Sequence, residues 1–296
     1  MRSLFSSALL VALLLPLSAC DETGAMASDV EAAVQDAQIA RQSGDYERAV
    51  TLLEDAFAQE PANAAVRVEL ATTLLERDGI DLLDVDRIAQ FITEEATGGA
   101  RQASAGVARS GAACVYAADP GAESFELTAI EGFADLVAEV ASIDRASDLL
   151  GTVIPSEIGQ FDLCSNVVDG ELTYDRAAAI DALRAQGLSE TQVRQVLAVN
   201  ALANVIDAYL YVSTELVQDV TWYRLGDGSI AICADDPEAL QADAEEAVAD
   251  FGAAVLSLDA RASLLGGDSA ASELVDLAKD AFQELRDAIG DYCDSV

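Results

Sequence analysis

The feature that most constrains the fold of this chain is the spacing of its apolar residues, which recur every three and four positions over most of the 296 residues. This spacing places apolar side chains on one face of an α-helix. The few clusters of Gly, Pro and Ser fall between the periodic stretches, where they separate one helix from the next. We therefore expect an all-α fold.

Three stretches show helix ends or apolar stripes. Asp236 and Pro237 form an N-cap followed by proline at the first helical position, which predicts a helix to about Leu265. Asp268 opens the last helix, and a further helix is predicted over residues 124–150. The stripes are Leu274, Ala278, Ala281, Leu285, Ile289 and Tyr292 in the last helix, and Leu127, Ile130, Ala134, Val137 and Ala141 in the other.

One segment departs from the helical pattern. Trp222, Tyr223 and Ile230 flank Gly226-Asp227-Gly228, a sequence typical of a tight turn between strands. We predict a short hairpin near residues 221–233.

The chain is strongly acidic, with 53 Asp and Glu against 16 Lys and Arg and a formal net charge of −37. Such a surface repels nucleic-acid phosphates and anionic lipid headgroups, so neither is an expected partner. Lys279 is the single lysine. Acidic excess with scarce lysine is common in proteins from salty habitats, where salt screens self-repulsion, and it indicates either a salt-tolerant source or simple solubility.

The absence of histidine narrows the chemistry available to the chain. It removes the usual general base, the Ser-His-Asp and Cys-His arrangements and the commonest metal ligand. No GxSxG, GxGxxG or P-loop pattern is present, Lys279 fits a solvated surface lysine, and Asp81, Asp84 and Asp86 do not fit an EF-hand loop. We expect no cofactor, no metal and no enzymatic activity.

The N-terminus carries the features of an export signal. Arg2 precedes an uncharged apolar run, and Leu17-Ser18-Ala19 leads into Cys20. This ending resembles the lipobox of bacterial lipoproteins, which implies that residues 1–19 are removed and that Cys20 becomes the acylated first residue. Residues 20–29 then form a lipidated tether at the inner or outer membrane of the cell envelope, with the body outside the cytoplasm. An ordinary secretory signal and a short membrane anchor are the alternatives.

Four further cysteines, Cys114, Cys164, Cys233 and Cys293, form an even set in an exported chain, which favours two disulfides. Three pairings exist. We favour Cys114 with Cys164 and Cys233 with Cys293, because each disulfide then stays within one half of the chain. The spacings differ from those of a zinc ribbon.

Residues 30–63 carry small residues, a glycine and a proline at spaced positions, namely Ala37, Gly44-Asp45-Tyr46, Ala49, Ala56 and Pro61. In these residues the segment resembles a tetratricopeptide repeat. The resemblance implies two helices that approach closely through their small side chains, with a tight turn at Gly44 and an end of the second helix at Pro61.

A second, degenerate unit follows from Ala64, so the resemblance covers about residues 30–95. Such arrays need three or more repeats to bury a core, so residues 96–296 are expected to form a helical bundle or solenoid that caps or continues them. The resemblance implies a groove, lined by the first helix of each repeat, that holds a peptide or partner protein. Its positions are Glu31, Val34, Gln38, Arg41, Gln42, Val68, Thr72 and Glu76.

The helix predicted over residues 190–220 is the most apolar of the mature chain, yet polar residues recur along one line of it. The line is a narrow wet edge, a set of polar groups satisfied inside the core, or a strip that lines a ligand cavity. The last alternative suits the helical lipoproteins that accompany tripartite transporters. The residues are Asn200, Asn204, Asp207, Tyr211, Thr214 and Gln218.

Together these features predict an envelope-anchored lipoprotein that acts as a protein-interaction scaffold or assembly factor. The alternatives are a ligand-binding accessory lipoprotein of a transport system and, third, a carboxylate-based hydrolase. A cavity enclosed by the Asn200 helix favours the transport class, and an open groove favours the scaffold. Two facing carboxylates in a cleft favour the enzyme.

Overall fold

The structure is a computed structural model that describes residues 29–80, 123–125, 140–210, 220–224, 230–234, 237–266 and 270–288. The helices are α1 (Asp29–Gln42), α2 (Tyr46–Gln59), α3 (Ala64–Arg77), α6 (Val140–Leu150), α7 (Ser156–Gly159), α8 (Leu163–Asn166), α9 (Arg176–Ala185), α10 (Glu190–Leu210), α11 (Pro237–Leu265) and α12 (Ala270–Ala288). The strands are β1 (Glu123–Phe125), β2 (Val167–Val168), β3 (Glu171–Leu172), β4 (Val220–Arg224) and β5 (Ile230–Ala234).

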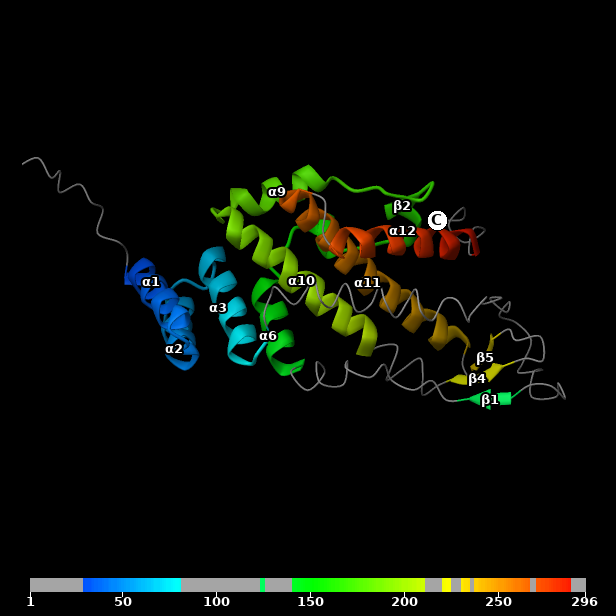
Figure 1. Ribbon diagram of the computed structural model, residues 1–296, viewed down its shortest axis with the longest axis horizontal. Coiled ribbons are helices and arrows are strands. Elements are labelled where there is room, and N and C mark those ends of the chain that lie inside the picture. Colours follow the sequence, from blue (N-terminus) through cyan, green and yellow to red (C-terminus); the bar gives the residue numbers. More distant parts are fainter. Residues whose placement is uncertain are drawn as a thin grey trace, which may run out of the picture.

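Successive helices are neighbours in space over most of the fold (Figure 1). α1 packs on α2, α2 on α3, α3 on α6 and α6 on α10, and α10 lies along α11. The hairpin of α1 and α2 forms one end of the molecule, and α12 packs on α11 away from that end. This arrangement confirms the predicted all-α fold, in which tetratricopeptide-like hairpins continue into a larger helical bundle.

One hydrophobic core runs through these helices. It extends from Ala37 in α1 to Phe282 in α12. At its centre, Leu197, Leu202 and Ile206 of α10 are at most 2% exposed. Each such side chain contributes about 1.5 to 3 kcal/mol relative to an exposed position. The first three helices therefore share a continuous core with the rest of the fold.

The two C-terminal helices lie close to their predicted positions. α11 spans Pro237–Leu265 as predicted and stops at Gly266, whose φ of +90° is rarely adopted by residues with a side chain. The apolar stripe of α12 differs from the prediction, because Ala281 is exposed and Phe282 is buried instead. Phe282 faces inward because its ring packs 4.8 Å, centroid to centroid, from that of Phe161.

The prediction of a continuous helix over residues 124–150 is wrong at its start. Ser124 lies in strand β1, and the described helical part is α6, which begins at Val140. Ser124 stands opposite Tyr223 of β4, so pairing with a distant strand overrides the local helical spacing. Residues 126–139 of the predicted stripe lie outside the described residues.

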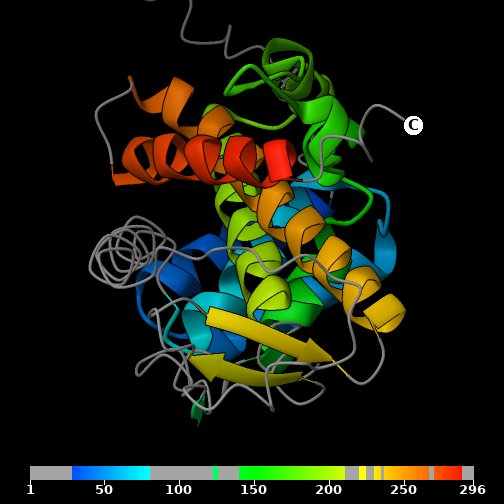
Figure 2. The same ribbon diagram turned by 90° about the vertical axis from the view of Figure 1, so that its right-hand side faces the viewer.

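β4 and β5 form the predicted hairpin, with Thr221 opposite Cys233. β1 joins them in an antiparallel sheet of order β1-β4-β5. The pair β2-β3 was not predicted, and its turn contains Asp169 and Gly170, both with positive φ. Figure 2 shows β4 and β5 at one end of α10 and α11, with α12 away from them.

Candidate functional site

Small residues bring α1 and α2 together as predicted. Ala37, Ala49 and Ala56 are at most 1% exposed, which lets the two helices approach closely. Gly44 makes the turn with a φ of +79°. Asp45 then caps α2, because its side chain accepts a hydrogen bond from the backbone N–H of the third residue of that helix.

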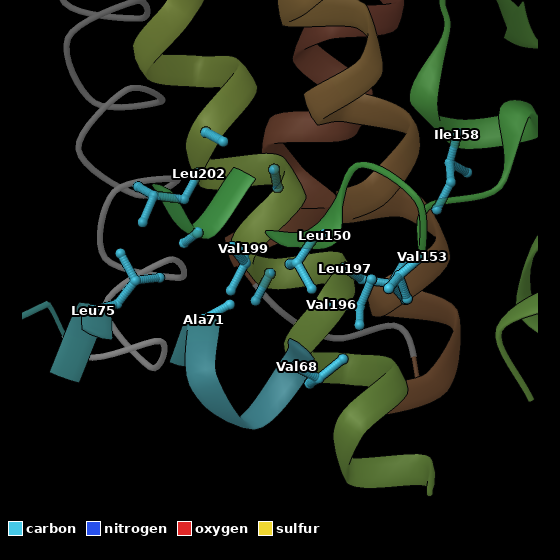
Figure 3. Close-up of a cluster of buried hydrophobic side chains, with 14 of the residues drawn as sticks. Val68, Ala71, Leu75, Leu150, Val153, Ile158, Val196, Leu197, Val199 and Leu202 are labelled. Carbon is cyan, nitrogen blue, oxygen red and sulfur yellow. The ribbon is translucent and has the colours of Figure 1, made fainter. Parts of the chain in front are cut away.

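The predicted groove faces solvent along α1 but is covered along α3. Helix α10 lies over α3, and Figure 3 shows Val68 and Ala71 of α3 directed toward Val196 and Val199 of α10. The placements are Glu31 and Gln42 exposed on α1, Val34, Gln38 and Arg41 half-buried on α1, Glu76 half-buried on α3, and Val68 and Thr72 buried on α3.

A buried carboxylate lies in the middle of the predicted groove and is bonded to side chains of α1 and α10. Glu69 of α3 is 4% exposed, and its Oε1 accepts hydrogen bonds from Gln38 Nε2 at 2.9 Å and from Gln192 Nε2 of α10 at 3.4 Å. Its Oε2 lies 3.1 Å from Arg41 Nη1, and Arg41 Nε lies 3.5 Å from Glu76 Oε2. Arg41 therefore joins α1 to α3, because a buried carboxylate requires a paired charge.

Glu69 and Gln192 belong to this site, but the spacing of the groove positions in the repeat does not predict them. Glu69 is a lone carboxylate within the largely apolar run of residues 66–75, and a charged residue in such a run indicates a buried partner. Gln192 gives no comparable signal, because it reaches Glu69 from 123 residues away along the chain.

The open part of the groove is a line of polar side chains on α1. Glu31, Gln35, Gln38 and Gln42 recur at intervals of four, three and four, which places them on one face of the helix. Gln38 is half-buried and the other three are exposed. We name these four residues the α1 strip. The exposed amides of Gln35 and Gln42 give it both hydrogen-bond donors and acceptors, whereas Gln38 Nε2 donates to Glu69.

The first residues of the second predicted site, Asn200 and Asn204, have hydrogen-bond partners within the helix packing. Asn200 is 5% exposed, and its Nδ2 donates to Ser257 Oγ of α11 at 2.8 Å and to the Ile158 carbonyl oxygen at 3.5 Å. Asn204 Nδ2 donates to the Asn200 carbonyl oxygen at 2.7 Å. These bonds favour buried, partnered groups over a cavity lining. Tyr211 and the rest of the line lie outside the described residues.

Further along α10, Asp207 interacts electrostatically with carboxylates of two other helices, α6 and α11. Burial, followed by the charges of Asp207 and Glu246, raises the pKa of Asp250 in α11 to about 6. Burial and the charge of Asp144 in α6 likewise raise the pKa of Asp207 in α10. Ionised together, these groups repel one another across the helix contacts.

We expect Asp250→Asn to stabilise the protein at neutral pH. The folded pKa lies above the unfolded value of about 4, so wild-type stability from this group falls as pH rises from about 4 to about 6. The stability gained by the variant over the wild type should thus be near zero at pH 4 and about 1 kcal/mol above pH 7, after allowance for partial exposure. Urea unfolding at both pH values measures it, with the exposed Asp36→Asn as control. An equal gain at both pH values contradicts the prediction.

The cysteines are described in part. Cys164 is disulfide-bonded. Only the backbone of Cys233 is described, and Cys20, Cys114 and Cys293 lie outside the described residues. Within the described ranges, no helix combines the length and apolarity needed to cross a membrane, and no group of His, Cys, Asp or Glu is arranged to hold a metal ion.

Comparison with known families agrees with the geometry of the first helices. Residues 40–81 match the family model of the tetratricopeptide repeat, from the end of α1 through α3. No curated protein and no solved structure matches the chain. This segment is therefore similar to a tetratricopeptide repeat, a type of repeat that generally mediates protein–protein interaction.

Proposed function

We propose that this chain is an envelope lipoprotein that scaffolds a protein partner through the α1 strip. The observation that carries the proposal is the tetratricopeptide match at residues 40–81, combined with the solvent-exposed face of α1, the helix that leads into the matched residues. α10 covers the α3 side of the groove, so a partner reaches the strip from the outer side of α1.

The chemistry of the strip favours a neutral or basic partner segment. Glu31 and Glu76 bring negative charge to the groove, and Arg41 is already bound to Glu69 and Glu76. An acidic peptide terminus would find no unpaired cation there among the described residues, in a chain with a net charge of −37. Amide side chains of the strip instead suit backbone and side-chain hydrogen bonds of a partner.

Anchoring through Cys20 places the strip close to a membrane. Asp29, the start of α1, follows Cys20 by nine positions, and an extended tether of that length spans about 30 Å. The partner is therefore a protein at or near the same membrane. We propose a non-catalytic role, since the chain has no histidine and its repeat belongs to an interaction class.

A ligand-binding accessory role and a carboxylate hydrolase receive less support. The accessory role depends on a cavity along the Asn200 line, whereas Asn200 and Asn204 are hydrogen-bonded within the helix packing. The hydrolase needs facing carboxylates in a cleft. Asp207 and Asp250 interact between packed helices of the core, which is a different setting.

We expect the double variant Gln35→Ala, Gln42→Ala to reduce the amount of copurified partner about tenfold, because it removes two exposed polar groups of the strip. The matched control is Asp36→Ala, Ile39→Ala, which alters two exposed residues of the same helix outside the strip. Both variants keep a strong helix former at each position, so both should fold. Quantitative mass spectrometry of proteins copurified from solubilised membranes compares them. Equal recovery from both variants contradicts the proposed surface.

We expect Cys20→Ala to abolish acylation and to release the protein from the membrane or leave its signal uncleaved, because the Cys20 thiol is the acylation point. Metabolic labelling with a fatty acid and membrane fractionation measure both effects. Labelling of Cys20→Ala at the wild-type level contradicts lipoprotein status.

A further inference from the structure

The structure places the disulfide-bonded Cys164 in the four-residue helix α8, close in sequence to a buried aromatic residue. Three residues earlier, the ring of Phe161 packs against Phe282 of α12 with 4.8 Å between centroids. Cys164 therefore lies beside the segment on which α12 is docked.

Successive turns of α12 contact residues progressively closer to Cys164. Lys279 Nζ lies 3.5 Å from Glu171 Oε2, and Gln283 Oε1 accepts a hydrogen bond from the Gly170 backbone N–H at 2.7 Å. One turn further on, Arg286 donates to the carbonyl oxygen of Val167. The helix thus runs antiparallel to this segment, and its C-terminal end approaches α8. Cys293 follows only five residues after the last helical residue, Ala288, within a reach of about 17 Å.

The sheet at the other end of the described structure contains one of the two remaining cysteines, Cys233 of β5. The other, Cys114, lies outside the described residues and precedes β1 of that sheet by nine positions in the sequence. α11 starts just after β5, and its Gly252 touches Phe161. The helix rises about 22 Å over the 15 steps from Pro237 to Gly252, which separates the sheet from α8. Figure 1 accordingly shows β4 and β5 apart from β2, the strand that directly follows α8.

We propose that Cys164 pairs with Cys293, which leaves Cys114 and Cys233 as the second pair. This connectivity differs from the pairing within chain halves that sequence order favours. Each disulfide forms when two thiols lose two protons and two electrons to an external thiol–disulfide oxidant, as expected in an oxidising compartment. The Cys164–Cys293 bond then fastens the end of α12 to α8 and holds the aromatic contact between Phe161 and Phe282.

Peptide mapping of the full mature protein under non-reducing conditions tests the pairing directly. Trypsin separates all four cysteines, because Cys164 falls on residues 146–176, Cys293 on 287–296, Cys114 on 110–145 and Cys233 on 225–261. We expect a linked pair of 146–176 with 287–296 that disappears on reduction. A link between 146–176 and either other peptide, or a free Cys164 thiol, overturns the proposal.

A matched pair of cysteine variants provides a second test of the pairing. In Cys293→Ser the Cys164 thiol should react with maleimide after denaturation without reductant, whereas in Cys114→Ser Cys164 should stay unreactive. The melting temperature should fall by several degrees in Cys293→Ser, because the lost bond closes a loop of about 130 residues. Labelling of Cys164 in Cys114→Ser but not in Cys293→Ser overturns the proposal.

Discussion

Replacing Arg41 with alanine should lower the free energy of unfolding by about 2 kcal/mol. The change leaves the Glu69 carboxylate, whose side chain is 6% exposed, without its charged partner. Removing one partner of a buried ion pair costs about 3 to 5 kcal/mol, and the hydrogen bonds from Gln38 and Gln192 reduce that cost here. Urea unfolding of the purified protein measures the loss.

Two further variants separate this ion pair from general effects of charge. Arg48→Ala removes an exposed arginine from α2 and should change stability by less than about 0.5 kcal/mol. Adding Glu69→Gln to Arg41→Ala removes the unpaired buried charge, so stability should recover in part. Loss of partner capture in Arg41→Ala would therefore report a damaged fold, and the α1 strip is the better place to test binding. If Arg41→Ala and Arg48→Ala are equally stable, Glu69 does not depend on Arg41.

Gly252→Ala should also destabilise the protein by about 2 kcal/mol, although alanine is the better helix former. A Cβ atom at Gly252 would lie 2.1 Å from Cγ and Cδ1 of Phe161. That ring is held against Phe282 and cannot give way, so overpacking of about 1 to 3 kcal/mol or more exceeds the gain in helix propensity of about 1 kcal/mol. Thermal and urea unfolding measure the net effect.

The contact with Phe161 can be checked by compensation. Phe161→Leu removes the ring that meets the new methyl group, so Gly252→Ala should cost less in that background than in the wild type. If Gly252→Ala instead raises stability in the wild type, as it does in exposed helices, then Phe161 does not pack against α11 at this position.

Local signals predict much of the fold. Asp236 and Pro237 give the start of α11, and the alanines at 37 and 49 give the contact of the first hairpin, because these features act within a helix or across one turn. The apolar spacing fails at Ser124, since pairing with β4 depends on residues about 100 positions away. It also fails at Ala281 and Phe282, where the aromatic contact with Phe161 decides which side of α12 is buried.

In the candidate site too, local signals are predictable from the sequence, whereas contacts between distant residues are not. The resemblance to a repeat identifies the face of α1, but it treats Arg41 and Thr72 as groove positions. Arg41 instead binds Glu69, and Thr72 is buried. Both outcomes depend on the packing of α1 against α3 and of α10 against α3, which no pattern within residues 30–63 encodes. For the same reason, the polarity of Asn200 can be read from the sequence, but its partner Ser257 cannot.

Site-specific photo-crosslinking tests the central claim most directly. A photoreactive amino acid at Gln42, on the α1 strip, is compared with one at Asp36, which is exposed on another side of the same helix. Irradiation of intact membranes should yield a discrete crosslinked species from position 42, identifiable by mass spectrometry, and little or none from position 36. Crosslinks of equal yield and identity from both positions, or from neither, contradict a partner-binding surface on the α1 strip.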